Sequence, residues 1–329
     1  MNPVLALLLG LAALVVGAEL VVREGSAIAA RFGISPLVVG MTIVSLGTSL
    51  PELAVGLNAA RHGNAGLAVG NIVGTNVVNI LLVLGLSALI RPITFENRTL
   101  RIDLPAMIGA AVLLFVLARD GGLTTRDGVW LCLYGAAYLL LMTVLARSDA
   151  QRTSSTAGDS RAADGPGSPA GPPAGERSVA REALLLVVGL AVVVAGSEFL
   201  VDGAVTIARN LGVTDAVIGL TIVAVGTSAP ELVTTLVSTV RGNRDIALGN
   251  LLGSSVFNIA LILGPTVLVA PGSVPVPDDV LALDLVLMVA AALVCLPVFR
   301  TGRRLNRWEG AAFVATYLAY MAWLLTTRL

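Results

Sequence analysis

The sequence predicts an all-α membrane protein whose ten transmembrane helices form two inverted five-helix repeats. Three observations support this prediction. The chain of 329 residues is 56% hydrophobic and 13% charged, with a mean hydropathy of +0.89, whereas soluble domains carry about 25% charged residues. Apolar stretches long enough to cross a bilayer recur along the whole length. One polar cassette appears twice, ending at Glu52 and again at Glu231.

Hydropathy predicts ten membrane spans, each bounded by polar or turn-forming residues. They cover residues 3–22, 35–60, 65–90, 103–118, 126–146, 182–201, 214–240, 244–270, 280–299 and 307–326. No basic residue precedes the first span, so we expect a membrane helix there rather than a cleaved signal peptide. The two cysteines, Cys132 and Cys295, lie in apolar spans and predict neither a disulfide framework nor a thiolate metal site.

A polar segment separates the fifth span from the sixth. Residues 148–180 are rich in Gly, Ser, Pro and Ala and contain almost no large apolar side chain. Such a segment cannot bury a core, so we expect a disordered linker there. The predicted organisation is a first five-helix repeat at 1–147, the linker at 148–180, and a second five-helix repeat at 181–329.

The two halves of the chain are similar in sequence. Residues 40–85 and 219–264 align without a gap and are identical at 23 of 46 positions. Shared membrane composition does not explain this match, because polar positions coincide as well. Five spans separate equivalent points, and an odd number reverses the orientation of the second copy. Inverted repeats of this kind are common in secondary transporters, which bind substrate near the midplane between the repeats.

The placement of the basic residues predicts the orientation in the membrane. All 21 basic residues are arginines, and with the amino terminus outside, sixteen of them fall on the inner side and five on the outer side. This distribution follows the positive-inside rule. We therefore expect a multi-pass protein of the cytoplasmic membrane with both termini outside and the linker in the cytoplasm. The formal net charge of zero indicates no nucleic-acid partner, and we expect a monomer in the lipid bilayer.

Each cassette places a glutamate directly after a proline inside a membrane span. A carboxylate in hydrocarbon is costly, which makes it a functional candidate by default. On a helix, Ser45, Thr48, Ser49 and Glu52 share one face, and the second copy has Ala224, Thr227, Ser228 and Glu231 at these positions. Pro51 and Pro230 loosen the preceding helical turn. Loosened backbone at membrane depth survives only where it is buried or lines a cavity.

The following span of each half adds further oxygen donors. Asn71, Thr75 and Asn79 recur at four-residue spacing, with Asn250, Ser254 and Asn258 as counterparts. Carboxylate, hydroxyl and amide oxygens suit hard cations such as Ca²⁺ and Na⁺ rather than zinc or copper. For any single Ser, Thr or Asn, bonding between helices is an open alternative.

Other acidic residues have weaker functional signals. Glu19 and Glu198 match between the halves but lie near span ends, where they can extend to the interface. Asp278, Asp279 and Asp284 are expected at the outer mouth of the protein, as a solvated face or, alternatively, as weak attractors of cations.

The two motifs resemble the α-repeats of the sodium/calcium exchanger family, within the cation/calcium antiporters. Each reads G-x-T-x-x-x-x-G-T-S-x-P-E followed by G-N-x-x-G-[ST]-[NS]-x-x-N. The resemblance implies a central Ca²⁺ site from Glu52, Glu231 and backbone oxygens of Thr48 and Thr227, completed by Asn79 and Asn258. It implies flanking Na⁺ sites from Ser49, Ser228, Thr75 and Ser254, with carbonyls of Ser45 and Ala224. K⁺-dependent relatives carry Asp at the position of Asn258, so Asn argues against K⁺ coupling. The family's alternating access is expected to slide spans one and six against the others.

The predicted function is secondary antiport of Na⁺ against Ca²⁺ by alternating access, without enzymatic activity and with no cofactor besides the transported ions. Three Na⁺ against two carboxylates leave a net positive load, so transport would be electrogenic and the membrane potential would assist Ca²⁺ export. Antiport of H⁺ against Ca²⁺ or another divalent cation is the alternative, and a cation channel a remote one. A hydrolase is disfavoured because no His, Lys or Asp base accompanies Ser49 or Ser228 on its span.

Overall fold

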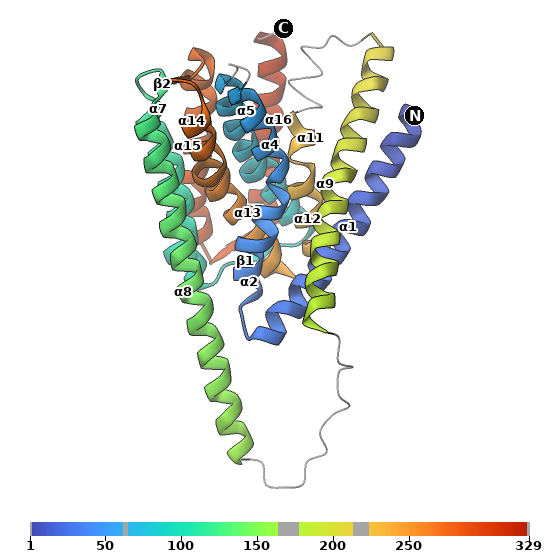
Figure 1. The fold of residues 1–329 in the computed structure, drawn as a ribbon, viewed down its shortest axis with the longest axis vertical. Coiled ribbons are helices and arrows are strands. Elements are labelled where there is room, and N and C mark those ends of the chain that lie inside the picture. The colour runs from blue at the N-terminus through green and yellow to red at the C-terminus, as the bar shows by residue number, and fades with distance from the viewer. Residues whose placement is uncertain (1, 62–64, 164–177, 213–223, 328–329) are drawn as a thin grey trace.

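The computed structural model describes residues 2–61, 65–163, 178–212 and 224–327, which form helices and two short strand pairs joined by turns and loops (Figure 1). Strand β1 (Ile93–Thr94) pairs antiparallel with β4 (Arg304–Leu305), and β2 (Gly122–Leu123) pairs with β3 (Val274–Pro275). Each pair joins the two halves of the chain at one end of the bundle. The all-α prediction is therefore confirmed for the described residues.

The helical elements of the first half follow the predicted spans, with several single-turn π-helical segments (η) inside them. They are α1 (Pro3–Phe32), α2 (Pro36–Val39), η1 (Gly40–Val44), α3 (Ser45–Thr48), α4 (Leu50–Arg61), α5 (Ala65–Val77), η2 (Val78–Val83), α6 (Leu84–Ile90), η3 (Thr99–Asp103), α7 (Leu104–Ala118) and α8 (Thr125–Ala163). Such π segments are frequent at functional sites because they re-aim side chains within a helix.

The second half repeats this order. Its elements are α9 (Val179–Asn210), α11 (Ala224–Thr227), α12 (Ala229–Val240), α13 (Arg244–Phe257), η5 (Asn258–Leu263), α14 (Gly264–Val269), η6 (Val280–Asp284), α15 (Leu285–Arg300) and α16 (Arg307–Thr327). The π segments η5 and η6 take the places that η2 and η3 hold in the first half.

Within the described residues, eight helices are long and apolar enough to cross a membrane. A ninth span results if Pro36–Thr48 and Leu50–Arg61, which meet at a bend of 43°, are counted as one. The predicted seventh span lies partly outside the described residues, and α11 and α12 form its described part.

Two helices extend beyond their predicted ends. Helix α1 continues ten residues past Val22 to Phe32, because its polar residues find partners there: Arg31 forms an ion pair with Glu182 of α9 at 3.0 Å. Helix α8 continues through Ala163, so the structure describes the first part of the predicted linker as helix. Residues 164–177 lie outside the described residues, and the division into two repeats joined by a disordered linker remains a prediction.

Helices α1 and α9 lie side by side along one flank of the molecule (Figure 1). They are antiparallel: Gly10 lies against Gly196, and Gly17 further along α1 lies against Gly189. Glycine allows such close backbone approach between membrane helices. The buried apolar side chains of this pair belong to a smaller cluster than those of the main bundle, and this cluster also contains Val39, Val44, Ala229 and Ile246, against which the pair packs.

The centre of the bundle is formed by the elements that carry the second motif of each half. Of the apolar window of Arg244–Val269, 94% is buried inside the protein, and of that of Gly66–Ile90, 78%, whereas the outer helices are far more exposed to their surroundings. The polar side chains on these two spans are therefore placed away from lipid.

Candidate functional site

Both cassettes break their helix at the same point. Helix α3 ends at Thr48 and α4 begins at Leu50, while α11 ends at Thr227 and α12 begins at Ala229. The intervening serines, Ser49 and Ser228, have nearly identical backbone angles, with φ −87° and −85° and ψ 8° and 4°. The predicted interruption is therefore confirmed. Its cause is the proline two residues later, which has no amide proton to continue the backbone hydrogen bonds of the helix.

The two glutamates occupy the first turn of the helix that follows each break. Glu52 is 0% exposed and Glu231 is 1% exposed. They come from opposite halves of the chain, and the two breaks lie side by side, because Ser49 of the first break contacts Glu231. A helix amino terminus stabilises negative charge, and this placement therefore helps to hold both carboxylates inside the protein.

Only one of the four oxygens of these carboxylates has a hydrogen-bond partner in the protein. Ser49 donates a hydrogen bond to Glu231 Oε1 at 2.8 Å. Glu231 Oε2 and both oxygens of Glu52 are buried without a hydrogen-bond partner. Buried polar atoms are nearly always partnered, so an unsatisfied group calls for an explanation. A bound cation between the two carboxylates would supply the missing interactions.

Hydroxyl and amide groups surround the carboxylates and join the two repeats. On one side, Thr48 donates to Asn250 Oδ1 at 3.1 Å, and Ser45 donates to the Asn250 carbonyl at 3.0 Å and lies 3.2 Å from Ser254 Oγ. Ser49 also lies 3.4 Å from Ser254 Oγ. These contacts bring α3 of the first half against α13 of the second.

Symmetry-related contacts occur on the other side, where the threonine–asparagine contact is longer and the contact between hydroxyls is of similar length. Thr227 donates to Asn71 Oδ1 at 3.5 Å, and Ser228 donates to Thr75 Oγ1 at 3.3 Å. Ala224 is the first residue of α11. The structure thus brings the predicted hydroxyl residues together in cross-repeat pairs.

Asn79 and Asn258 are fully buried, and each lies at the beginning of a π segment. Neither amide has a hydrogen-bond partner for its oxygen or its nitrogen. Together with the glutamates they give seven buried polar atoms without a protein partner. This set is the largest concentration of unsatisfied polar atoms among the described residues.

The donor chemistry of this cluster selects hard cations. No group of three or more His, Cys, Asp or Glu side chains that could hold a metal ion occurs in the described ranges. The available donors are two carboxylates, several hydroxyls and amide oxygens. Ca²⁺ takes six to eight oxygen ligands in flexible arrangements, and such a mixed set suits it.

Asn250, which the sequence predicts as an oxygen donor, makes more contacts than the sequence indicates, because its amide nitrogen also donates to Thr235 Oγ1 at 3.0 Å. One contributor could be found only with the structure. Ser197 of α9 donates to the carbonyl of Gly226 at 2.9 Å, directly before the second break. Its counterpart in the first half is Ala18, so the repeat contained no signal for it.

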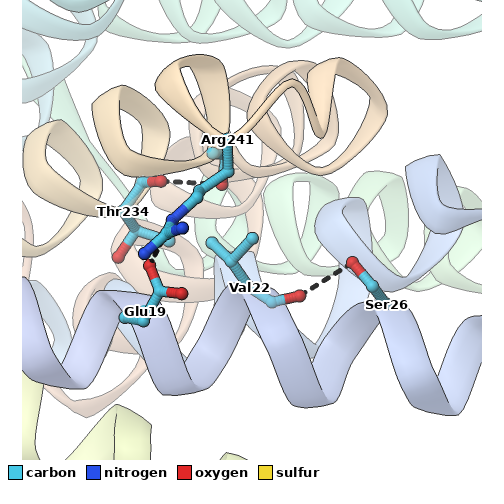
Figure 2. Close-up of polar contacts among 6 residues, drawn as sticks. Glu19, Val22, Ser26, Thr234 and Arg241 are labelled. Carbon is cyan, nitrogen blue, oxygen red and sulfur yellow. Dashed lines mark hydrogen bonds and ion pairs between the residues drawn. The ribbon is translucent and has the colours of Figure 1, made fainter.

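An ion pair ties the flanking helix α1 to the cassette helix α12. Arg241 Nε lies 2.8 Å from Glu19 Oε2 (Figure 2). Ser26 of α1 donates to the carbonyl of Val22, and Ser238 of α12 donates to that of Thr234. Glu19 therefore lies within α1, which continues to Phe32, rather than near the end of the helix, and it forms a half-exposed ion pair.

Comparison with known proteins gives consistent matches along the chain. Residues 2–144 and 182–326 match the family described as sodium/calcium exchanger protein. "Putative antiporter CaxA" of Alkalimonas amylolytica is 37% identical over 316 residues, which cover 95% of both chains. "Sodium/calcium exchanger MaX1" of Methanosarcina acetivorans is 34% identical over 347 residues, covering 96% of this chain and 97% of that one. A solved structure of the sodium-calcium exchanger NCX_Mj, soaked with Na⁺ and Sr²⁺, has a TM-score of 0.81 at 30% identity over 98% of both chains.

Proposed function

The chain belongs to the sodium/calcium exchanger family and is a membrane-embedded cation/Ca²⁺ antiporter, and on this premise we propose that Na⁺ drives it to export Ca²⁺. The observation that supports the proposal best is the pair Glu52 and Glu231. Each half contributes one buried carboxylate, Ser49 of the first half bonds Glu231 of the second, and seven polar atoms of the two glutamates, Asn79 and Asn258 lack a protein partner.

In this proposal the central Ca²⁺ lies between the two glutamates. Their combined charge of −2 neutralises the ion, and backbone oxygens of Thr48 and Thr227 loosened by the helix breaks complete its shell. Asn79 and Asn258 would complete the same middle position. Their unpartnered amide oxygens are suitable ligands.

Flanking Na⁺ ions would occupy the hydroxyl pairs on either side. One pair is Ser49 with Ser254 at 3.4 Å, and the other is Ser228 with Thr75 at 3.3 Å. Carbonyls of Ser45 and Ala224 would add to them. Because Na⁺ and Ca²⁺ draw on the same two carboxylates, binding of one ion lowers the affinity for the other, and this competition is the requirement for exchange.

The transport cycle that we propose uses ten helices in two inverted repeats. Helices α1 and α9 hold equivalent places in the two halves and run antiparallel, which supports the inversion. Their close glycine contacts with each other and the small apolar cluster through which they pack on the bundle make them suitable as a unit that slides against the rest. The start of α1 and the end of α16 lie at the same end of the molecule (Figure 1), consistent with both termini outside the cytoplasmic membrane.

Antiport of H⁺ against Ca²⁺ is the second candidate. The specific observation in its favour is that the oxygens of Glu52 have no protein partner, and a proton could neutralise them as well as Na⁺. The Ser and Thr pairs favour Na⁺, because protons need no flanking hydroxyl sites.

The test is Ca²⁺ uptake into proteoliposomes driven by an outward Na⁺ gradient or an outward H⁺ gradient, each with the membrane potential clamped. We expect Ca²⁺ uptake with the Na⁺ gradient and not with the H⁺ gradient. A membrane potential that drives positive charge outward should accelerate this uptake, because the exchange would move net positive charge outward with Na⁺. Glu52→Gln and Glu231→Gln should abolish it. Glu198→Gln, which changes an exposed carboxylate of α9, should transport normally. Uptake that follows only the H⁺ gradient would replace Na⁺ with H⁺ as the driver.

A further inference from the structure

A cavity of about 290 Å³ lies at the end of the bundle opposite to the carboxyl terminus. Helix α15 ends there at Arg300, and α16 begins there at Arg307 and runs back to the other end (Figure 1). The start of the span Thr99–Ala118 forms the opposite wall. The lining therefore comes from both halves of the chain and consists of Asn97, Leu100, Arg101, Arg300 and Arg303.

Three of these five residues are arginines, and all three are exposed. In the part of the chain that the structure describes, no ion pair or side-chain hydrogen bond engages the guanidinium groups of Arg101, Arg300 or Arg303. The nearby carboxylate of Glu96 forms no ion pair with them either. Three like charges around one cavity repel one another, so the arrangement is favourable only when an anion compensates them.

The backbone of Arg303 adopts an unusual conformation at this cavity. Its φ of 52° is the only positive φ of a non-glycine residue among those that the structure describes. The Arg303 carbonyl accepts a hydrogen bond from the Phe95 amide at 2.8 Å, and the Phe95 ring stacks on Phe299 with centroids 3.8 Å apart. These contacts hold the turn in place. Backbone strain of this kind clusters at ligand-binding sites.

The arginines are not explained by their end of the molecule alone. The positive-inside rule accounts for basic residues on one side of the membrane, but not for their convergence on a cavity. Arg304 is exposed on the same turn, yet it lies outside the lining. The repeat also does not require them: since η3 and η6 are equivalent, Asn97 and Arg101 correspond to Asp278 and Ala282 at the other end.

We propose that this cavity binds a phosphate group, presented by the headgroup of an acidic phospholipid. Guanidinium groups bind phosphate oxygens in bidentate pairs, and the Asn97 amide and the start of the helix add donors and partial positive charge. Basic pockets between membrane helices on the cytoplasmic side bind acidic headgroups, and the proposed orientation places this end in the cytoplasm. A bound phosphate would bridge Arg101 of the first half to Arg300 and Arg303 of the second, and so stabilise their packing.

The binding test is thermal unfolding of the full chain in detergent, titrated with phosphatidylglycerol, phosphatidylcholine or inorganic phosphate. We expect phosphatidylglycerol to raise the unfolding temperature with saturation, and phosphatidylcholine to have no such effect. Arg101→Gln and Arg300→Gln should each raise the half-saturating concentration of phosphatidylglycerol about fivefold, which corresponds to about 1 kcal/mol per arginine. Arg304→Gln, the matched control outside the cavity, should leave it unchanged.

Arg303→Gly separates loss of binding from loss of folding. Glycine adopts a positive φ without strain, so without lipid this variant should unfold at the same or a higher temperature than the unmodified protein. Its half-saturating concentration of phosphatidylglycerol should nevertheless rise about fivefold.

Two results would overturn the proposal: a phosphatidylglycerol response that all three cavity substitutions leave intact, or one that Arg304→Gln weakens equally. An equal response to inorganic phosphate would keep the anion site and make free phosphate its ligand. The measurement uses no ion gradient, so its outcome is independent of the driver of Ca²⁺ transport.

Discussion

Two equivalent glycines of the central helices have very different surroundings, and this difference leads to a direct test of alternating access. Gly74 of α5 has no atom within 4 Å of the position that a Cβ would take. Its counterpart Gly253 of α13 would place a Cβ against the Ser45 hydroxyl and 2.6 Å from the Met41 carbonyl oxygen. If the two halves exchange surroundings during transport, Gly74 acquires the close packing that Gly253 has here.

The perturbation is the pair Gly74→Ala and Gly253→Ala. In a helix interior, Ala is more favourable than Gly by about 1 kcal/mol in either state, so this term does not change the balance between states. The added methyl group is free of contacts at residue 74 in this structure, but at residue 253 it meets backbone, and overpacking of this kind costs about 1–3 kcal/mol. Gly74→Ala therefore should favour the conformation described here by a factor of about 5–150.

The assays are thermal unfolding in detergent and Ca²⁺ flux in proteoliposomes. We expect Gly74→Ala to unfold at the same or a higher temperature than the unmodified protein while its maximal exchange rate falls. Gly253→Ala should unfold at a lower temperature. The reasoning is refuted if Gly74→Ala exchanges at the full rate, or if Gly253→Ala is as stable as Gly74→Ala.

Three further predictions concern the candidate site and the linker. Saturating Ca²⁺ should stabilise the unmodified protein by about 2.7 kcal/mol at a concentration one hundred times Kd, and Glu52→Gln should remove this stabilisation. Thermal unfolding of both proteins with and without Ca²⁺ measures the difference. Ser49→Ala should destabilise the ion-free protein by about 1.5–3 kcal/mol, because the Ser49 hydroxyl bonds a carboxylate. Ser228→Ala should destabilise it by only about 0.5–1.5 kcal/mol, because the partner of Ser228 is a neutral hydroxyl. Equal losses of stability in the two variants would contradict this assignment. Deletion of residues 154–175 should leave Ca²⁺ flux near that of the full chain, and an inactive deletion variant would show that the linker has an active role.

The positions of the helix breaks could be predicted because they depend on local chemistry. Pro51 and Pro230 lack an amide proton, which weakens the helix just before them, and the structure places the interruptions two residues earlier, at Ser49 and Ser228. The residues that meet across the repeats could also be anticipated, since the same polar pattern occurs twice. The identity of each partner and its distance depends on how two distant segments pack.

The predicted end of the first span at Val22 was wrong, because a contact with a distant part of the chain stabilises a longer helix α1. The hydropathy of residues 23–32 indicates a loop, but Arg31 is stabilised within the helix by Glu182, a residue 151 positions away. Ser197 was not predicted to belong to the site, and the reason is also a contact between distant parts of the chain. Its role depends on the proximity of the Gly226 carbonyl, which neither periodicity nor the repeat can indicate.

The two glutamates differ in their hydrogen bonding, and this difference indicates the order in which an ion contacts them. Glu231 already accepts a hydrogen bond from Ser49, whereas both oxygens of Glu52 lack a partner. The serines are identical in the two cassettes, so the difference arises from packing, and Ser228 bonds Thr75 instead. An arriving cation finds two unpartnered oxygens at Glu52 but only one at Glu231, because Oε1 of Glu231 already accepts the bond from Ser49. We infer that it binds Glu52 first, and that Ser49 releases Glu231 as the ion is enclosed between the two halves.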